Sequence, residues 1–540
     1  MSLLTGPSYH LILSFLLGCC IYAIVYILGT STASRLYRSR KGLRQIPGPV
    51  GVPIIGNLRQ LSNRPQNELI AWAREYGELF QIKLGLTTWV YVNSPEAARE
   101  IMDKQSAHTS SRLPTPVASD LIGGDMRFVL MPDNQKWSFW RRTTHRLLTP
   151  SRCLGYLANQ DLEAKQLVYD CLTDNKNETE FYSHARRFAT SIIMATTYGW
   201  RLPTANGEDI EKIYQILHEL SDSMVPGTYI ADAAPFLAKL PPCLQWWRKD
   251  GLKHLDYQIE VWMGYWRRLQ SRVQVGASPD CFGKQLISSS PLTELEQGFL
   301  AGSLVEAGAE TTSTTINSCL RYLANNPDAQ TAAHAELDAV IGRERSPTFA
   351  DQGSLPYIEA CHRETSRLRP PSNNGVLHYT TKDLEYKGFH IPKGVVVAMN
   401  QYAMYYDPER YPDPEQFRPE RFLRQAGPSH HGGAPRWSYD AEAGDLPDRW
   451  VFGAGRRLCP GMHFAVNSLY IGLAKILWAF EIRPPLDENG CEIQLDVSDE
   501  GGYMDGRFTV PKPYRLRFIP RSKKIEEIVR REWAEAEKGE

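Results

Sequence analysis

Paired cysteines and an excess of charge are both missing from this chain. Its 540 residues include ten cysteines, but no two of them form a CxxC pair. Such scattered thiols suit a reducing compartment better than a secreted disulfide scaffold. Lys and Arg together number 61, as do Asp and Glu, so the whole chain presents no basic field for nucleic acid. No GxGxxG sequence follows a predicted strand, so a dinucleotide-binding domain is not predicted either.

Charged residues are also absent from residues 1–34. The centre of that segment, LILSFLLGCCIYAIVYIL (Leu11–Leu28), is almost wholly apolar, and with its flanks it approaches the ~30 Å of a bilayer core. A cleaved signal peptide carries its positive charges first, whereas here the cations follow the apolar run. We therefore predict a membrane anchor over residues 1–34, with a transmembrane helix at about 10–30 and the downstream chain on the cytoplasmic side.

The remaining chain divides by composition. Residues 35–58 form a basic and proline-rich hinge, in which the prolines at 47, 49 and 53 make residues 46–58 a stiff, non-helical connector. Residues 59–522 form one predicted domain, mainly α with small β-sheets, and residues 523–540 form a charged tail that suits a solvated helix. Residues 76–94 read as two strands around a turn near Gly85. Apolar residues spaced by three and four predict helices over 161–172, 254–273 and 327–342.

One cysteine stands in an unusual context, in FGAGRRLCPGMHFA (Phe452–Ala465). Cys459 follows Arg457 by two residues and directly precedes a predicted helix, and both positive charge and a helix start stabilise a thiolate. A single axial thiolate on haem iron needs one protein ligand and no second cysteine. A lone cysteine is otherwise most often a small buried apolar residue.

The spacing of this segment is more specific than the cysteine itself. Phe452-xx-Gly455-x-Arg457-x-Cys459-x-Gly461 resembles the haem-binding signature of cytochromes P450. The resemblance implies the P450 fold, haem b as the cofactor and Cys459 as the axial ligand of its iron. Phe452, Gly453 and Arg457 are then further cofactor-binding residues.

Two short sequences upstream are similar to the structural motifs of that family. Glu364 and Arg367, in ETSR, are three residues apart and share a helix face, which alone is common in surface salt bridges. The stretch resembles the P450 ExxR motif, and Pro419 to Phe422 (PERF) resembles the segment that supplies its third partner, Arg421. The resemblance implies a buried Glu364–Arg367–Arg421 network that serves folding and haem retention.

A third stretch, AGAETTSTT (Ala307–Thr315), places an acid and adjacent hydroxyls in a predicted helix. Taken alone, it also suits a helix-packing seam of small residues. It resembles the distal helix of P450s, which implies that Glu310 and Thr311 are the catalytic pair that delivers protons to O₂.

Haem carries two propionates, which are bound by Arg, His or Trp donors. Trp137 and Arg141 are four residues apart on a predicted helix face and look like the family's WxxxR pair. Arg457 and His378 complete the set that the resemblance implies. A core tryptophan and a loop histidine satisfied by its neighbours are the alternatives for Trp137 and His378.

The resemblance covers about residues 45–520 and implies a monooxygenase that inserts one atom of O₂ into an apolar small molecule. Its anchor and hinge are similar to microsomal members of the family, which receive electrons from NADPH–cytochrome P450 reductase, with cytochrome b5 as a further candidate partner. That likeness implies an endoplasmic reticulum membrane protein, and the wider sequence looks similar to fungal enzymes of specialised (secondary) metabolism. Ring closure, coupling or desaturation by the same oxidant stays open, as does a non-catalytic haem-binding sensor. Trp246 and Trp247 suit either a membrane interface or a packed helix edge.

Overall fold

The computed structural model describes residues 32–539 apart from residues 54, 63, 175–177, 290, 373, 426–436 and 440–446. Its internal contacts divide the chain into two units. We call the residues up to Leu113 together with Leu377–Asn400 the first unit, and Pro114–Val376 together with Gln401–Glu540 the second unit. The second unit contains all but one of the sequence-predicted site residues, the exception being His378.

The first unit is built on a four-stranded sheet with the order β2-β3-β7-β4. Strands β2 (Leu79–Leu84) and β3 (Thr87–Val92) are antiparallel and turn at Gly85, whose φ of +59° favours glycine, so the predicted hairpin is confirmed. Strand β7 (Val396–Met399) runs parallel to β3, and β4 (His378–Tyr379) is antiparallel to β7. Buried aromatic and branched side chains on one face hold this sheet together: Leu69, Phe80, Ile82, Trp89, Tyr91, Val396 and Ala398.

A smaller sheet of the first unit has the order β1-β6-β5. Its strands are β1 (Arg44–Gln45), β5 (Leu384–Tyr386) and β6 (Phe389–Ile391). The helical segments of this unit are residues 32–41, η1 (Leu58–Gln60), α2 (Gln66–Tyr76), α3 (Pro95–Ala98), η2 (Arg99–Lys104) and α4 (Ser106–Thr109). Ser94 caps α3 by accepting from Ala97 N, and Pro95 fits the first turn because its missing N–H has no helical partner there.

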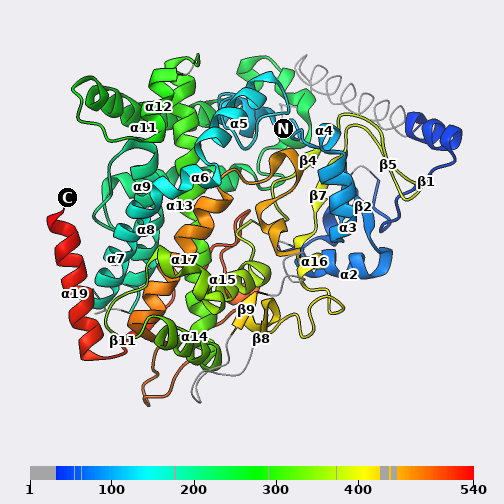
Figure 1. Cartoon of the computed structure of the whole chain (residues 1–540). Helices are drawn as coiled ribbons and strands as arrows, with labels where there is room; N and C mark the ends of the chain where they lie inside the picture. Colours follow the sequence, from blue (N-terminus) through cyan, green and yellow to red (C-terminus); the bar gives the residue numbers. More distant parts are fainter. Residues whose placement is uncertain are drawn as a thin grey trace, which may run out of the picture. The chain divides into compact units, whose positions relative to one another are not determined.

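The second unit is mostly helical (Figure 1). Its α-helices are α5 (Gln135–Leu147), α6 (Pro150–Cys153), α7 (Leu157–Thr173), α8 (Glu180–Tyr198), α9 (Glu208–Ser223), α10 (Ile230–Ala233), α11 (Arg248–Gln274), α12 (Phe282–Ser289), α13 (Glu294–Asn325), α14 (Pro327–Val340), α15 (Pro356–Leu368), α16 (Gln401–Tyr405), α17 (Met462–Ala479), α18 (Asp499–Gly502) and α19 (Lys523–Lys538).

Short helical turns and two small sheets complete the second unit. The turns are η3 (Pro116–Ile122), η4 (Leu154–Tyr156), η5 (Pro235–Lys239), η6 (Pro242–Leu244), η7 (Phe349–Ser354), η8 (Pro419–Phe422), η11 (Pro447–Phe452) and η12 (Gly455–Arg457). The sheets pair β8 (Leu423–Gln425) with β9 (Trp437–Tyr439) and β10 (Phe480–Arg483) with β11 (Arg517–Pro520), both antiparallel. The predicted mainly helical class with small sheets is therefore confirmed, and the helices predicted over 161–172, 254–273 and 327–342 correspond to α7, α11 and α14.

Helix α13 is the long central element of the second unit and packs against α8, α15 and α17 (Figure 1). It begins with a capping box in which the Thr293 hydroxyl accepts from Glu296 N and the Glu296 carboxylate accepts from Thr293 N. These two bonds satisfy donors that a helix start otherwise leaves open, and they fix where the helix begins. Its position among three buried helices makes α13 one wall of the protein interior.

The C-terminal tail is only partly solvated. Helix α19 buries Ile525, Ile528, Val529 and Trp533 along one side, and the Trp533 ring stacks on Tyr169 of α7 at 5.8 Å. The charged residues that dominate its composition occupy the other side. The expectation of a solvated helix therefore holds for one face, while the other face packs onto α7 (Figure 1).

Within the described part of the chain, no helix is both long and apolar enough to cross a membrane. The transmembrane helix predicted at about residues 10–30 lies outside the described residues.

Candidate active site

Cys459 lies at the end of a tight loop that immediately precedes α17. Its backbone N–H donates to Phe452 O at 2.8 Å and closes the loop, while Gly453 N donates to Trp450 O at 3.0 Å. Gly453 and Gly455 have φ values of +85° and +54°, which side-chain-bearing residues rarely adopt. The two glycines therefore allow the chain to turn back sharply enough to place the sulfur at the start of α17.

Two opposing effects act on the Cys459 thiol. Burial raises its pKa, whereas the Gly461 N–H that bonds to the sulfur and the positive charge of Arg141 both lower it. The residue nevertheless keeps an accessible surface, unlike Cys153, Cys171, Cys281, Cys319 and Cys361, which are buried. Among the described cysteines, Cys459 thus combines a thiol whose pKa is raised by burial with a residue that is not fully enclosed.

The sequence-predicted cations collect around this loop. Arg141 Nη2 donates to Leu458 O at 2.5 Å, directly beside Cys459. The Arg457 guanidinium lies 3.8 Å from the centre of the Trp137 ring and donates from Nη2 to Met131 O at 2.7 Å. Trp137 is 3% exposed, so it packs as well as stacks. The structure therefore brings Trp137, Arg141, Arg457 and Cys459 together.

One narrow strip of α13 is open to contact. Among residues 298–324, all of them described, every residue is buried except Ser303, Ala307, Gly308 and Thr311. Ser303, Ala307 and Thr311 are spaced by four and line one helix face, so we call these four residues the accessible stripe. Thr311 Oγ1 donates to Ala307 O at 2.8 Å, the back-bond that a helical threonine can form. The stripe marks the side of α13 against which a flat group or a substrate can lie.

Glu310 does not belong to the accessible stripe. Its side chain is buried, and Thr314 Oγ1 donates to Oε1 at 3.5 Å, while Oε2 is enclosed without a hydrogen-bond partner. Burial raises the pKa of Glu310, and the positive charge of Arg186 on α8 acts in the opposite direction. A carboxyl with a raised pKa keeps its proton to higher pH, which suits a residue that supplies protons next to Thr311.

The structure also brings Glu364, Arg367 and Arg421 into one network. Arg367 pairs with Glu364 through two bonds, Nε to Oε2 at 2.7 Å and Nη2 to Oε1 at 2.8 Å, and both side chains are fully buried. Arg421 Nε donates to Glu364 Oε1 at 2.9 Å. The alternative of a surface salt bridge is thereby excluded for this pair, and the carboxylate of Glu364 holds α15 to the segment that contains η8.

His378 is the one predicted site residue in the first unit. Its Nδ1 lies 2.8 Å from Thr109 O, and because a carbonyl only accepts, Nδ1 carries the proton. This bond orients the ring within the first unit, and the propionate contact implied for His378 stays a prediction.

Comparison with known proteins agrees with this geometry. The family model described as Cytochrome P450 matches residues 46–498. Cytochrome P450 monooxygenase pgmC of Aspergillus terreus is 38% identical over 512 residues, covering 93% of this chain and 91% of its own. Cytochrome P450 monooxygenase verL of Clonostachys rogersoniana is 34% identical over 536 residues, covering 97% and 94%. Cytochrome P450 monooxygenase 69 of Postia placenta is 33% identical over 521 residues, covering 90% and 91%.

The chain belongs to the cytochrome P450 family. It is accordingly an oxidoreductase of the monooxygenase class, and the relatives named above are all fungal. The family implies haem with a cysteine ligand, and the residues of this P450 fit that group. Cys459 stands at a helix start and is not fully enclosed, two arginines and a tryptophan surround its loop, and α13 offers the accessible stripe. Iron binding would deprotonate the thiol despite the raised pKa, because a coordinating thiol loses its proton to the metal.

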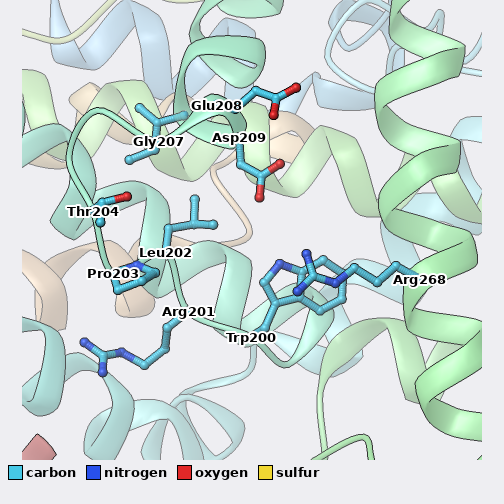
Figure 2. A pocket seen from close by; sticks show the side chains of 10 residues that line it. Trp200, Arg201, Leu202, Pro203, Thr204, Gly207, Glu208, Asp209 and Arg268 are labelled. Atoms are coloured by element: carbon cyan, nitrogen blue, oxygen red, sulfur yellow. The ribbon is translucent and has the colours of Figure 1, made fainter.

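A separate hollow on the second unit involves none of the predicted site residues. It is lined by Trp200, Arg201, Leu202, Pro203, Thr204, Gly207, Glu208, Asp209, Ile210 and Arg268 (Figure 2). The Arg268 guanidinium stacks over the Trp200 ring at 4.5 Å, as Figure 2 shows. The charged residues around it have other partners, since Glu208 pairs with Lys212 and Arg201 with Glu163, and we assign the hollow no part in the P450 reaction.

The structure adds one charged pair that sequence reasoning missed. Glu306 directly precedes Ala307, and its Oε1 accepts from Arg127 Nη2 at 3.0 Å. Two acids one helical turn apart, Glu306 and Glu310, after the mostly apolar stretch 298–305 were the signal available in the sequence. Nothing in the sequence around Arg127 predicts its contact with α13, because that contact joins residues 179 positions apart.

The buried network yields a prediction for stability. Arg421→Ala should lower the free energy of unfolding by about 2 kcal/mol or more, because the fully buried Glu364 carboxylate loses a charged donor. Urea unfolding followed by far-ultraviolet circular dichroism measures this, and the haem content of the purified protein reports haem retention.

Arg418→Ala is the matched control for that experiment. Arg418 lies in the same loop and gives Glu364 only its backbone N–H, at 2.9 Å, which alanine retains, while its exposed side chain makes a 3.7 Å ion pair. It should change the free energy of unfolding by no more than about 0.5 kcal/mol. Equal losses for the two variants would contradict the role assigned to Arg421.

Proposed function

We propose that this P450 inserts one atom of O₂ into an apolar small molecule of fungal specialised metabolism, using electrons from NADPH. The observation that carries the proposal is the accessible Cys459 thiol at the start of α17, with Arg141 beside it and Trp137 and Arg457 around its loop. The accessible stripe of α13 supplies the second surface that such a reaction needs, because it leaves an otherwise buried part of the helix accessible at Thr311.

Each of the predicted site residues has a separate role in this proposal. Cys459 would hold the iron, and Arg141, Arg457 and Trp137 would hold the propionates. Haem supplies, when bound, the redox chemistry by which O₂ is activated. In this proposal Glu310 supplies a proton from a buried carboxyl whose pKa is raised, and the Thr311 hydroxyl on the accessible stripe delivers it.

Electrons come, in this proposal, from a separate protein. The support for this is the family to which the chain belongs, whose microsomal members receive electrons from a separate reductase. NADPH–cytochrome P450 reductase is the proposed donor, with cytochrome b5 as a further candidate.

We also propose that the protein is held at the endoplasmic reticulum membrane by residues 1–34, with the catalytic domain on the cytoplasmic side. The second unit provides a surface that suits this placement. Trp246 is 68% exposed, and Leu244 and Ile230 nearby in the chain are 55% and 52% exposed. Trp247, by contrast, is 6% exposed and packs with Val117, Ile122 and Ala231. The alternative of a packed helix edge therefore applies to Trp247, and we propose the membrane interface for Trp246.

The catalytic pair is tested by Thr311→Val, which keeps the side-chain shape and removes the hydroxyl. Product formed per NADPH consumed should fall by roughly 10²-fold, the usual contribution of a positioned proton donor. The assay uses the compound that gives the largest spin-state shift in a screen of apolar metabolites.

Thr315→Val is its control, because Thr315 Oγ1 makes the same back-bond one turn later, to Thr311 O at 2.9 Å, at a buried position. That variant should retain a product yield close to that of the wild type. A Thr311→Val enzyme with undiminished yield would refute the role of the hydroxyl.

The membrane surface is tested by Trp246→Ser in a form that lacks residues 1–34. Flotation with phospholipid vesicles should show weaker association than for the unsubstituted truncated form, because an exposed indole favours the interface of a bilayer. Val275→Ser serves as the control, since Val275 is 77% exposed at the end of α11, outside this group of residues. Association that depends on Val275 as much as on Trp246 would count against the assignment.

A further inference from the structure

Glu306 is a buried acid that the proposed mechanism does not use. It lies on α13 between apolar residues and is 8% exposed. Burial raises the pKa of Glu306, and the neighbouring Arg127 opposes that rise. Burying an acid in this part of α13 costs free energy of folding, so a function of Glu306 is needed to explain its presence.

Arg127 holds the carboxylate from one side only. Its Nη2 donates both to Glu306 Oε1, at 3.0 Å, and to Gln258 Oε1 on α11, at 2.9 Å. Arg127 is 2% exposed, and its Nε and Nη1 are enclosed without hydrogen-bond partners among the described residues. Gln258 is itself fixed, because its amide donates to Ile122 O at 3.1 Å.

This geometry differs from that of the structural ion pair in the same unit. Glu364 and Arg367 pair through two oxygens and two nitrogens, the arrangement that gives most stability. Glu306 and Arg127 share one oxygen and one nitrogen. An ion pair that served stability alone would be expected to use both carboxylate oxygens, as Glu364 does. Glu306 uses only Oε1 for Arg127, so its second oxygen is available for another partner.

The Glu306 side chain is not completely enclosed, since 7% of its surface is exposed. Glu306 Oε2 accepts no hydrogen bond from the described residues, and it is not among the enclosed atoms, whereas Glu310 Oε2 is. Positions three apart are neighbours on a helix surface, so Glu306 borders Ser303 of the accessible stripe, and it directly precedes Ala307. Glu306 therefore lies beside the strip of α13 on which Thr311 is exposed.

We propose that Glu306 Oε2 is the polar anchor of the substrate site and accepts a hydrogen bond from a hydroxyl or N–H group of an otherwise apolar substrate. Arg127 is the positioning residue that holds the carboxylate in place. The inference rests on the proposed function and narrows its substrate class to apolar molecules that carry a hydrogen-bond donor, such as phenols, indoles or amides.

Matched probe pairs test the anchor without knowledge of the natural substrate. The probes are 4-alkylphenols with chains from butyl to decyl and their methyl ethers, together with indole and 1-methylindole. Spin-state titration of the full-length haem-loaded enzyme gives a dissociation constant for each. In the wild type, the donor of a pair should bind about 10- to 100-fold more tightly than its methylated partner, as expected for a hydrogen bond to a charged acceptor.

Three variants separate recognition from folding. Glu306→Gln keeps an acceptor oxygen without the charge and should give an intermediate ratio. Arg127→Met combined with Glu306→Leu removes both charges, so that no unpaired ion is left buried, and should reduce the ratio to near one. Glu294→Gln removes a carboxylate from the exposed first turn of α13 and should leave the wild-type ratio unchanged.

Three results would contradict the role of Glu306 as the polar anchor. A wild-type ratio near one, an unchanged ratio in the double variant, or no spin-state shift with any probe would each do so. The carbon monoxide spectrum of the same reduced samples separates this from a failure of the proposed function. A normal thiolate spectrum with no donor preference refutes only the role of Glu306, whereas loss of the thiolate spectrum in the wild type removes the function on which the inference rests.

Discussion

The bond that the Cys459 sulfur can make is the constraint on which the rest of this protein depends. A thiol buried this deeply is normally neutral, and burial does raise its pKa here. The loop that ends in Cys459 counteracts this with the Gly461 N–H, the charge of Arg141 and the N-terminal end of α17. Two glycines at positive φ and the bond from Cys459 N to Phe452 O fix the loop. They hold Cys459 directly before α17, where the residue is not fully enclosed.

Helix α13 supplies the complementary constraint through its periodicity. A helix enclosed by α8, α15 and α17 has few positions at which another molecule can touch it, and those positions recur every three or four residues. Thr311 stands on that strip, whereas Glu310 and Glu306 flank it with carboxyl groups held in buried or half-open settings. Because the same helix carries all three, proton supply and substrate recognition can be close in space and still use different faces.

Much of the site could be predicted from sequence because its parts are local. The spacing around Cys459, the i and i+3 relation of Glu364 and Arg367, and the i and i+4 relation of Trp137 and Arg141 all follow from neighbouring residues on one loop or helix. The hairpin at Gly85 and the helices α7, α11 and α14 were predictable for the same reason. Long-range contacts were not: the Arg127–Glu306 pair, the burial of Trp247 against Val117 and the packing of α19 onto α7 depend on tertiary structure.

The central claim is that the Cys459 thiolate binds haem iron, and the carbon monoxide difference spectrum of the dithionite-reduced full-length protein tests it most directly. We expect the Soret band at the long-wavelength position that gives the family its name, and its loss in a Cys459→Ser variant. A serine variant that retains the band would contradict the account, as would a wild-type protein that binds haem without showing it.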